Sequence, residues 1–154
     1  MKVGIMQPYF FPYLGYWQLI NAVDVYVVYD DVNYIKGGWI SRNNILLNGS
    51  KHLITIPLEG ASSFKKINEI GITKDTIAKK KIIKTLELAY GKAPYYGAVI
   101  QIIKKLISEN DNIALLNYNS IVEINKYLGI STKIYLSSQI EKNMSLKGQD
   151  KVID

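Results

Sequence analysis

The sequence predicts an α/β fold in which a small parallel sheet is flanked by helices, with an inserted β-hairpin and a helical segment. Residues 2–6 and 25–29 are short, mostly apolar runs of the kind that form strands covered on both faces. Residues 14–23 lie between them and suit a helix, so the two strands should be parallel and joined by a right-handed crossover. Residues 132–136 supply a further short strand.

Two loops follow the first two strands and should leave the same edge of the sheet. Residues 7–13 contain Pro8 and Pro12, which the interior of a strand or a helix does not tolerate. Residues 30–43 follow the second strand and begin with two aspartates. In open α/β sheets ligands bind at the carboxyl edge of the strands, so these two loops are the first candidates for a site.

The middle of the chain combines one hairpin signal with three helical patterns. Asn48-Gly49 predicts a hairpin between residues 45–47 and 52–57, because type I′ turns need positive φ. Residues 58–72 are expected to form a loop. Apolar stripes then predict helices at about 76–90, 95–109 and 112–128.

We expect one α/β domain over residues 1–154. Residues 144–150 have the composition of a polar loop, and 151–154 look like the first turn of a further helix. A helix cut after one turn cannot bury a useful face. The sequence therefore predicts a fragment of a longer protein, truncated at its C-terminus.

The composition is that of an ordinary globular chain, 48% hydrophobic and 21% charged. Cysteine is absent and histidine occurs once, which excludes thiol nucleophiles and thiolate or multi-histidine metal sites. No apolar run approaches the roughly 20 residues that span a bilayer, and no signal-peptide pattern opens the chain. We therefore expect a cytoplasmic protein without a membrane span.

The net charge of +6 comes almost entirely from lysine, since 18 of the 19 basic residues are Lys. Many of these lysines fall on predicted helix surfaces, where a solvated face is the natural interpretation. The arginines and interleaved aromatic residues that nucleic-acid surfaces favour are missing, so we expect no nucleic-acid partner.

The second loop holds the single arginine of the chain, Arg42. Its planar guanidinium can grip phosphate or carboxylate in a way that lysine cannot copy. Gly37 and Gly38 free the backbone for close approach, and Trp39 supplies a flat ring. Arg42 is therefore a candidate anion clamp; the alternative is a structural ion pair with one of the aspartates that open the loop.

Several blocks of residues resemble the WbqC-like protein family. They are Ile5-Met6-Gln7-Pro8-Tyr9-Phe10-Phe11-Pro12-Tyr13-Leu14-Gly15-Tyr16, Asp24, Tyr29-Asp30-Asp31-Val32 and Lys36-Gly37-Gly38-Trp39-Ile40-Ser41-Arg42-Asn43. The resemblance covers most of the chain and is densest over residues 1–57. It implies a role in bacterial surface-polysaccharide (O-antigen, lipopolysaccharide) biosynthesis, with transfer of glycine or another small acyl group to a sugar.

A remoter resemblance is to Rossmann-like folds of the nucleotidyltransferase type. Residues 11–16 have the Phe-Pro-x-x-Gly-aromatic rhythm of such folds, but without their histidines. Residues 145–148, Ser-Leu-Lys-Gly, stand where those folds place a phosphate loop. This similarity implies the fold, while the histidines that help such folds to stabilise a transferring phosphate are absent here.

The candidate site combines the two loops. We expect aromatic rings to stack on a sugar or nucleoside, amides to bond its hydroxyls, and Lys36 and Arg42 to hold a diphosphate. Asp30 or Asp31 would act as general base on the acceptor. The predicted substrate-binding residues are Gln7, Tyr9, Tyr13, Tyr16, Lys36, Trp39, Arg42 and Asn43.

Three functional hypotheses remain open. The first is transfer of a small acyl or aminoacyl group to a nucleotide-linked or lipid-linked sugar. The second is a non-catalytic module that binds a sugar or nucleotide within a polysaccharide-assembly complex. The third is nucleotidyl transfer with Mg²⁺ held by Asp30 and Asp31. The residues do not identify a required cofactor. The two candidates are Mg²⁺ and a nucleotide-linked donor.

Overall fold

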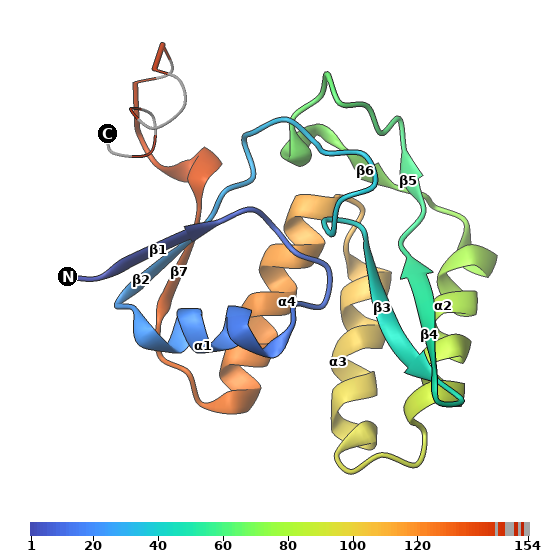
Figure 1. Cartoon of the computed structure of the whole chain (residues 1–154). Helices are drawn as coiled ribbons and strands as arrows, with labels where there is room; N and C mark the ends of the chain where they lie inside the picture. Colours follow the sequence, from blue (N-terminus) through green and yellow to red (C-terminus); the bar gives the residue numbers. More distant parts are fainter. Residues whose placement is uncertain (144, 147–149, 151, 153–154) are drawn as a thin grey trace.

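The computed structural model describes residues 1–143, 145–146, 150 and 152. A three-stranded parallel sheet contains β1 (Val3–Met6), β2 (Val25–Val28) and β7 (Lys133–Leu136), in the order β1-β2-β7. Figure 1 shows the three strands pointing toward one common edge. The predicted α/β class and the parallel pairing of the first two strands are confirmed. The predicted closing loop and helical turn fall largely outside the described residues.

The crossover helix α1 (Leu14–Ala22) connects β1 to β2. It has no side-chain cap at its N-terminus, so tertiary packing must hold it in place. Tyr16 and Ile20 are buried against Tyr26 and Val28 of the central strand. The hydroxyl of Thr132 donates to the carbonyl of Ile20 at a distance of 2.8 Å, which joins the end of α1 to the start of β7.

A β-hairpin follows the second loop. It consists of β3 (Arg42–Leu47) and β4 (Ser50–Thr55), and its turn has φ values of 51° at Asn48 and 75° at Gly49. These values match the type I′ turn that the sequence predicts. The next segment is more ordered than expected, because β5 (Leu58–Glu59) pairs with β6 (Gly71–Ile72) around a short 3₁₀ helix at Ile67–Glu69.

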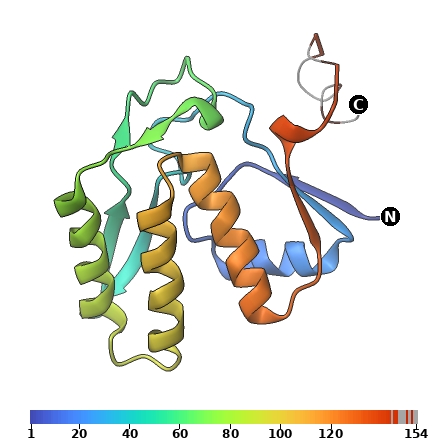
Figure 2. The same ribbon diagram turned by 180° about the vertical axis from the view of Figure 1, so that it is seen from behind.

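Three helices complete the fold, namely α2 (Thr76–Tyr90), α3 (Tyr96–Glu109) and α4 (Ile113–Leu128). Each helix begins and ends within one residue of its predicted position. The side chain of Asp75 caps α2, that of Asn112 caps α4, and Gly129 ends α4 with φ of 71°. Figure 2 shows α2, α3 and α4 side by side on the far side of the molecule.

The buried residues form two hydrophobic clusters. The smaller lies between α1, α4 and the parallel sheet, and the larger lies between the hairpin and the helices α2–α4. Phe10 belongs to the larger cluster although it follows β1, so the first loop connects the two halves of the molecule.

Within the described part of the chain, no helix is long and apolar enough to cross a bilayer.

Burial of the tyrosine at the centre of the smaller cluster predicts alkaline unfolding. Burial raises the pKa of Tyr16 to about 12, from 10.0 for an exposed tyrosine. The raised folded-state pKa means that this contribution to stability is complete below about pH 10 and is lost as pH rises through about 12. Unfolding followed by circular dichroism and tyrosinate absorbance should show this loss. Tyr16→Phe should make stability fall less steeply between these pH values; an unchanged slope would contradict the assignment.

Candidate functional site

Three loops leave the common edge of the sheet at which β1, β2 and β7 end (Figure 1). They are residues 7–13, 29–41 and 137–142. The first two are the loops in which the sequence places the site, and the third follows β7. Ligands of open α/β sheets bind at this edge, so the arrangement gives a candidate site at the predicted end of the sheet.

The first two loops are in direct contact. The backbone N–H of Phe10 donates to the carbonyl of Trp39 at 2.9 Å. At the start of β3, directly after the second loop, the side-chain amide of Asn43 donates to the carbonyls of Phe10 and Phe11 at 3.0 and 2.6 Å. The rings of Tyr9 and Trp39 are nearly parallel, at 5°, with centroids 6.3 Å apart. The predicted meeting of the two loops is confirmed.

Asn43 holds a strained turn in place. Phe11 has φ of 49°, a left-handed conformation that costs energy for a bulky side chain. Besides its two donor bonds, Asn43 accepts a bond from the N–H of Asn44 through its side-chain oxygen, at 2.7 Å. Its amide group is therefore bonded within the protein, and its direct role in this conformation is to shape the first loop.

Replacing Asn43 with alanine should lower the free energy of unfolding by about 1–3 kcal/mol, because two partly buried carbonyls lose their donors. Urea unfolding measures this change. Asn33→Ala is the matched control, because Asn33 is exposed in the second loop and should change stability by less than about 0.5 kcal/mol. Equal effects at the two positions would contradict the role of Asn43.

Arg42 pairs with neither aspartate. Its guanidinium donates to the carbonyl of Gly37 and lies over the ring of Trp39, with Cζ 5.8 Å from the ring centroid. Its Nε is buried and has no hydrogen-bond partner within the described residues. Gly37 has φ of 75°, and a Cβ there would stand 3.2 Å from the guanidinium. The alternative of a structural ion pair with the aspartates is therefore wrong.

The two aspartates turn toward the end of β7. Asp30 is 1% exposed, and its carboxylate accepts bonds from the N–H and the hydroxyl of Ser138 at 2.9 and 2.7 Å. The hydroxyl of Ser137 lies 3.0 Å from Oδ1 of Asp30 and 2.5 Å from Oδ1 of Asp31. A hydroxyl has one proton, so the hydroxyl of Ser137 shares a single hydrogen-bond donor between the two carboxylates.

Lys142 supplies the positive charge next to this pair. Its Nζ lies 2.9 Å from Oδ2 of Asp31, and the side chains of the two residues are only 9% and 4% exposed. The ammonium also donates to the carbonyl of Ser137. We name these five residues the acid–serine cluster: Asp30, Asp31, Ser137, Ser138 and Lys142.

The other predicted site residues differ in their exposure. Tyr13 is 58% exposed and its ring meets that of Tyr9 edge-on, at a centroid distance of 5.8 Å. Gln7 is half-buried and its backbone carbonyl accepts a bond from the Tyr16 hydroxyl at 3.2 Å. Tyr16 itself is a core residue, so its ring face is not available to a ligand in this conformation. Lys36 is exposed in the second loop.

The sequence reasoning missed a pocket beside the acid–serine cluster. It has a volume of about 350 Å³ and is lined by Asp31, Lys66, Asn68, Ser138, Ile140, Glu141 and Lys142. The N–H of Ile67 donates to Val32 and that of Asn68 to Asp30, at 2.9 and 3.0 Å. These backbone bonds hold the segment that contains Lys66 and Asn68 against the second loop, at the edge of the pocket. The pair Ser137-Ser138 directly after a strand was the available signal for this side of the site.

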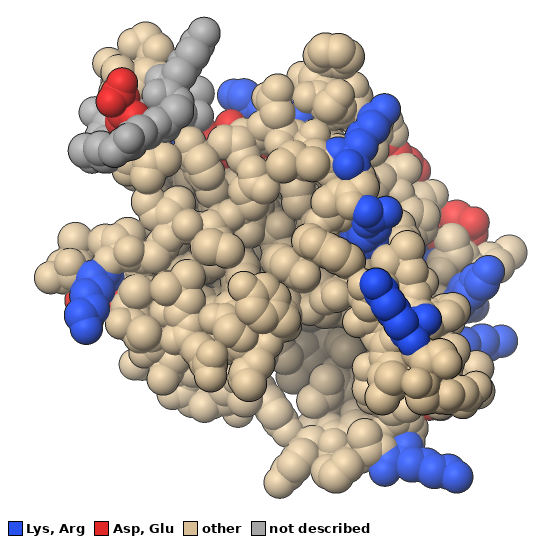
Figure 3. All heavy atoms as spheres, in the orientation of Figure 1, with Lys and Arg blue, Asp and Glu red and all other residues tan. Residues whose placement is uncertain are grey.

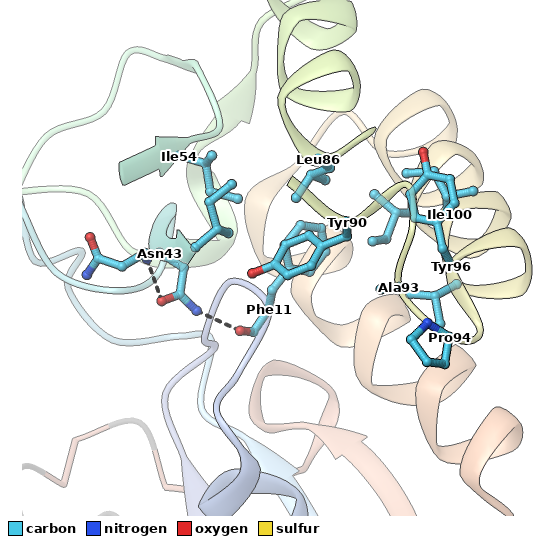
Figure 4. A pocket seen from close by; sticks show the side chains of 13 residues that line it. Phe11, Asn43, Ile54, Leu86, Tyr90, Ala93, Pro94, Tyr96 and Ile100 are labelled. Carbon is cyan, nitrogen blue, oxygen red and sulfur yellow. Dashed lines mark hydrogen bonds between the residues drawn. The ribbon is translucent and has the colours of Figure 1, made fainter. Parts of the chain in front are cut away.

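A second pocket, of about 350 Å³, lies between the hairpin and the helices α2 and α3. Figure 4 shows Asn43 and Ile54 on the hairpin side, Tyr90 in the middle, and Tyr96 and Ile100 on the other side. Its lining is mostly apolar, and Phe11 forms part of its wall. Figure 3 shows that this face of the molecule is hollowed below its centre, between α1 and the hairpin.

The acid–serine cluster does not suit a magnesium ion. Both oxygens of Asp30 accept bonds from serines, and Oδ2 of Asp31 is paired with Lys142, so a cation would have to displace that ammonium. Among the described residues, no three His, Cys, Asp or Glu side chains come together as metal ligands.

Comparisons with known proteins identify one family and one relative. The model of the WbqC-like protein family matches residues 7–154. The chain is also 34% identical over 136 residues to "Uncharacterized protein Rv1507c" of Mycobacterium tuberculosis (strain ATCC 25618 / H37Rv), a match that covers 86% of this chain. It spans 58% of the length of that relative. No solved structure matches the chain. Because the family model matches residues 7–154 and this relative is 34% identical, the chain belongs to the WbqC-like protein family.

Proposed function

We propose that this protein transfers a small acyl or aminoacyl group, such as glycine, to a phosphate-bearing sugar during synthesis of a bacterial surface polysaccharide such as O-antigen. The sugar would be nucleotide-linked or lipid-linked. The observation that carries the proposal is the environment of Arg42, a half-buried guanidinium that lies over an aromatic ring and forms no salt bridge with a carboxylate among the described residues.

A guanidinium that is partly removed from water is costly unless an anion accompanies it. Within the part of the chain that the structure describes, the guanidinium of Arg42 contacts the carbonyl of Gly37 and the ring of Trp39 but no anion. A phosphate can accept paired N–H bonds from a guanidinium. Trp39 is 42% exposed and stands beside Tyr9, so a ring surface for a sugar or base adjoins the cation. A phosphate-bearing sugar matches both features.

Asp31 is the better candidate for the general base. It lines the pocket of about 350 Å³ at the carboxyl edge, and Asp30 does not. Lys142 stabilises its negative charge at 2.9 Å, and Ser137 fixes its orientation. Asp31 would accept the proton of the acceptor amine or hydroxyl as that atom attacks the carbonyl carbon of an activated donor. The new bond to the acyl carbon forms as the bond to the leaving group breaks, so no protein nucleophile is needed.

A mass-spectrometric assay tests this function. The protein is incubated with acetyl or glycyl thioesters and a panel of nucleotide-linked sugars, and the mass of each sugar is followed. A gain of one acyl mass is expected for one pair, and Asp31→Asn should slow it by about 10²–10⁴-fold. Glu87→Gln, an exposed change on α2, is the matched control and should leave the rate unchanged. Equal rates for wild type and Asp31→Asn would contradict this role.

A second candidate function is a non-catalytic module that binds the same sugar. The contacts of Asp31 favour it, because its Oδ1 accepts from the hydroxyl of Ser137 and its Oδ2 is paired with Lys142 inside the protein. Under this hypothesis no pair of substrates gains mass, while isothermal titration detects sugar binding that Asp31→Asn leaves intact.

A further inference from the structure

We propose that a cleft between α2 and α3 is a binding site for a small polyphosphate, such as a pyrophosphate or triphosphate group. The cleft has a volume of about 580 Å³, within the range of ordinary small-molecule sites. It lies at the start of α2 and the end of α3, the upper ends of these two helices in Figure 2. It shares no lining residue with the candidate site at the edge of the sheet.

Four lysines surround this cleft. Lys74 precedes α2, Lys79 and Lys80 come from its first turns, and Lys104 comes from α3. Ile83 and Ile107 contribute its apolar lining, and Thr76, Ser108 and Asn110 add polar groups. Two acids, Glu109 and Asp111, also line it, so the lining residues carry an excess of positive charge.

The four lysines form no salt bridge with any residue that the structure describes. The salt bridges among the described residues join Lys105 to Glu123 and Lys142 to Asp31, and none involves the lysines of the cleft. Lys105, the neighbour of Lys104, pairs with Glu123 of α4 at 3.3 Å, so the adjacent positions have different roles. Like charges around a concave surface focus a positive potential there, which favours an anion.

The chemistry of the lining selects the class of anion. Ammonium groups act as separate point charges, which suits several phosphates in a row better than one planar carboxylate. No aromatic side chain lines the cleft, so no platform exists for stacking a nucleobase. A short chain of phosphates, free or as part of a nucleotide, is therefore the ligand we assign.

The test is isothermal titration of tripolyphosphate into the protein at low and high salt. Millimolar or tighter binding is expected at low salt, weakening strongly as salt screens the charges. The double variant Lys79→Ala/Lys104→Ala should weaken it by at least about tenfold. The matched control Lys81→Ala/Lys84→Ala removes the same charge from exposed positions on α2 outside the cleft, and should change the affinity by less than about twofold.

Equal losses in the two double variants would show that net charge alone is responsible and would overturn the proposal, as would absence of binding. Titration of pyrophosphate against a nucleoside diphosphate identifies the source of the phosphates: similar affinities indicate that the phosphates alone are bound. The loss of affinity caused by Lys79→Ala/Lys104→Ala should be the same in the Arg42→Lys background, which separates this site from the one in the proposed function. Thermal unfolding of each variant confirms that the fold is retained.

Discussion

Replacing Lys142 with methionine is expected to lower the free energy of unfolding by about 3–5 kcal/mol, because the buried Asp31 then loses the ammonium that lies 2.9 Å from its Oδ2. The side chain of Lys142 is 9% exposed and that of Asp31 is 4% exposed, so the ion pair is largely removed from water. Methionine retains most of the packing of the lysine stem. Urea unfolding measures the change.

Two further variants separate the ion pair from general effects at the end of β7. Lys133→Met removes a lysine from an exposed position of the same strand and should change stability by less than about 0.5 kcal/mol. The double variant Asp31→Asn/Lys142→Met removes both charges and should recover a large part of the stability. A loss below about 1 kcal/mol in Lys142→Met would show that the pair is solvated and would contradict the buried cluster.

Changing Arg42 to lysine is expected to weaken the binding of a phosphate-bearing sugar by about 10–100-fold, because lysine cannot form two parallel bonds to phosphate. Isothermal titration with the tightest-binding member of a panel of sugar nucleotides measures the affinity. Stability should change little, since among the described residues the Arg42 guanidinium donates a single hydrogen bond, to the carbonyl of Gly37.

Gly37→Ala is a second test of the same group. It keeps the charge of Arg42 but places a methyl group against the guanidinium at a position with φ of 75°. Its affinity should therefore fall as well. Gly49→Ala is the matched control, because Gly49 has the same φ in the hairpin turn but open space around its Cβ. Unchanged affinity in both Arg42→Lys and Gly37→Ala would contradict a phosphate at this position.

The sequence predicted the features that local patterns encode. The spacing of apolar residues and the capping residues predicted the positions of the helices, and Asn48-Gly49 predicted the hairpin turn. The prolines after β1 placed a loop, and the parallel order of β1 and β2 then placed both loops at one edge. These features depend on residues that are close together in the chain, so a single sequence is enough to find them.

The parts that were missed depend on contacts between distant residues. The partners of Asp30 and Asp31 come more than a hundred positions later, at Ser137 and Ser138, and only the strand order β1-β2-β7 brings them together. Lys66 reaches the rim because its segment bonds to the second loop. The structure places Tyr16 in the core rather than at the substrate, a difference the sequence does not reveal because the helix is apolar on several faces.

The measurement that tests the central claim most directly is a ¹H–¹⁵N correlation spectrum of the protein during titration with a sugar nucleotide such as UDP-glucose. The central claim is that the loops after β1, β2 and β7 form one binding rim. The indole N–H signal of Trp39 and the backbone amide signal of Ser138 should then shift together and give a single dissociation constant. Shifts at one of these positions without the other, or two different dissociation constants, would contradict it.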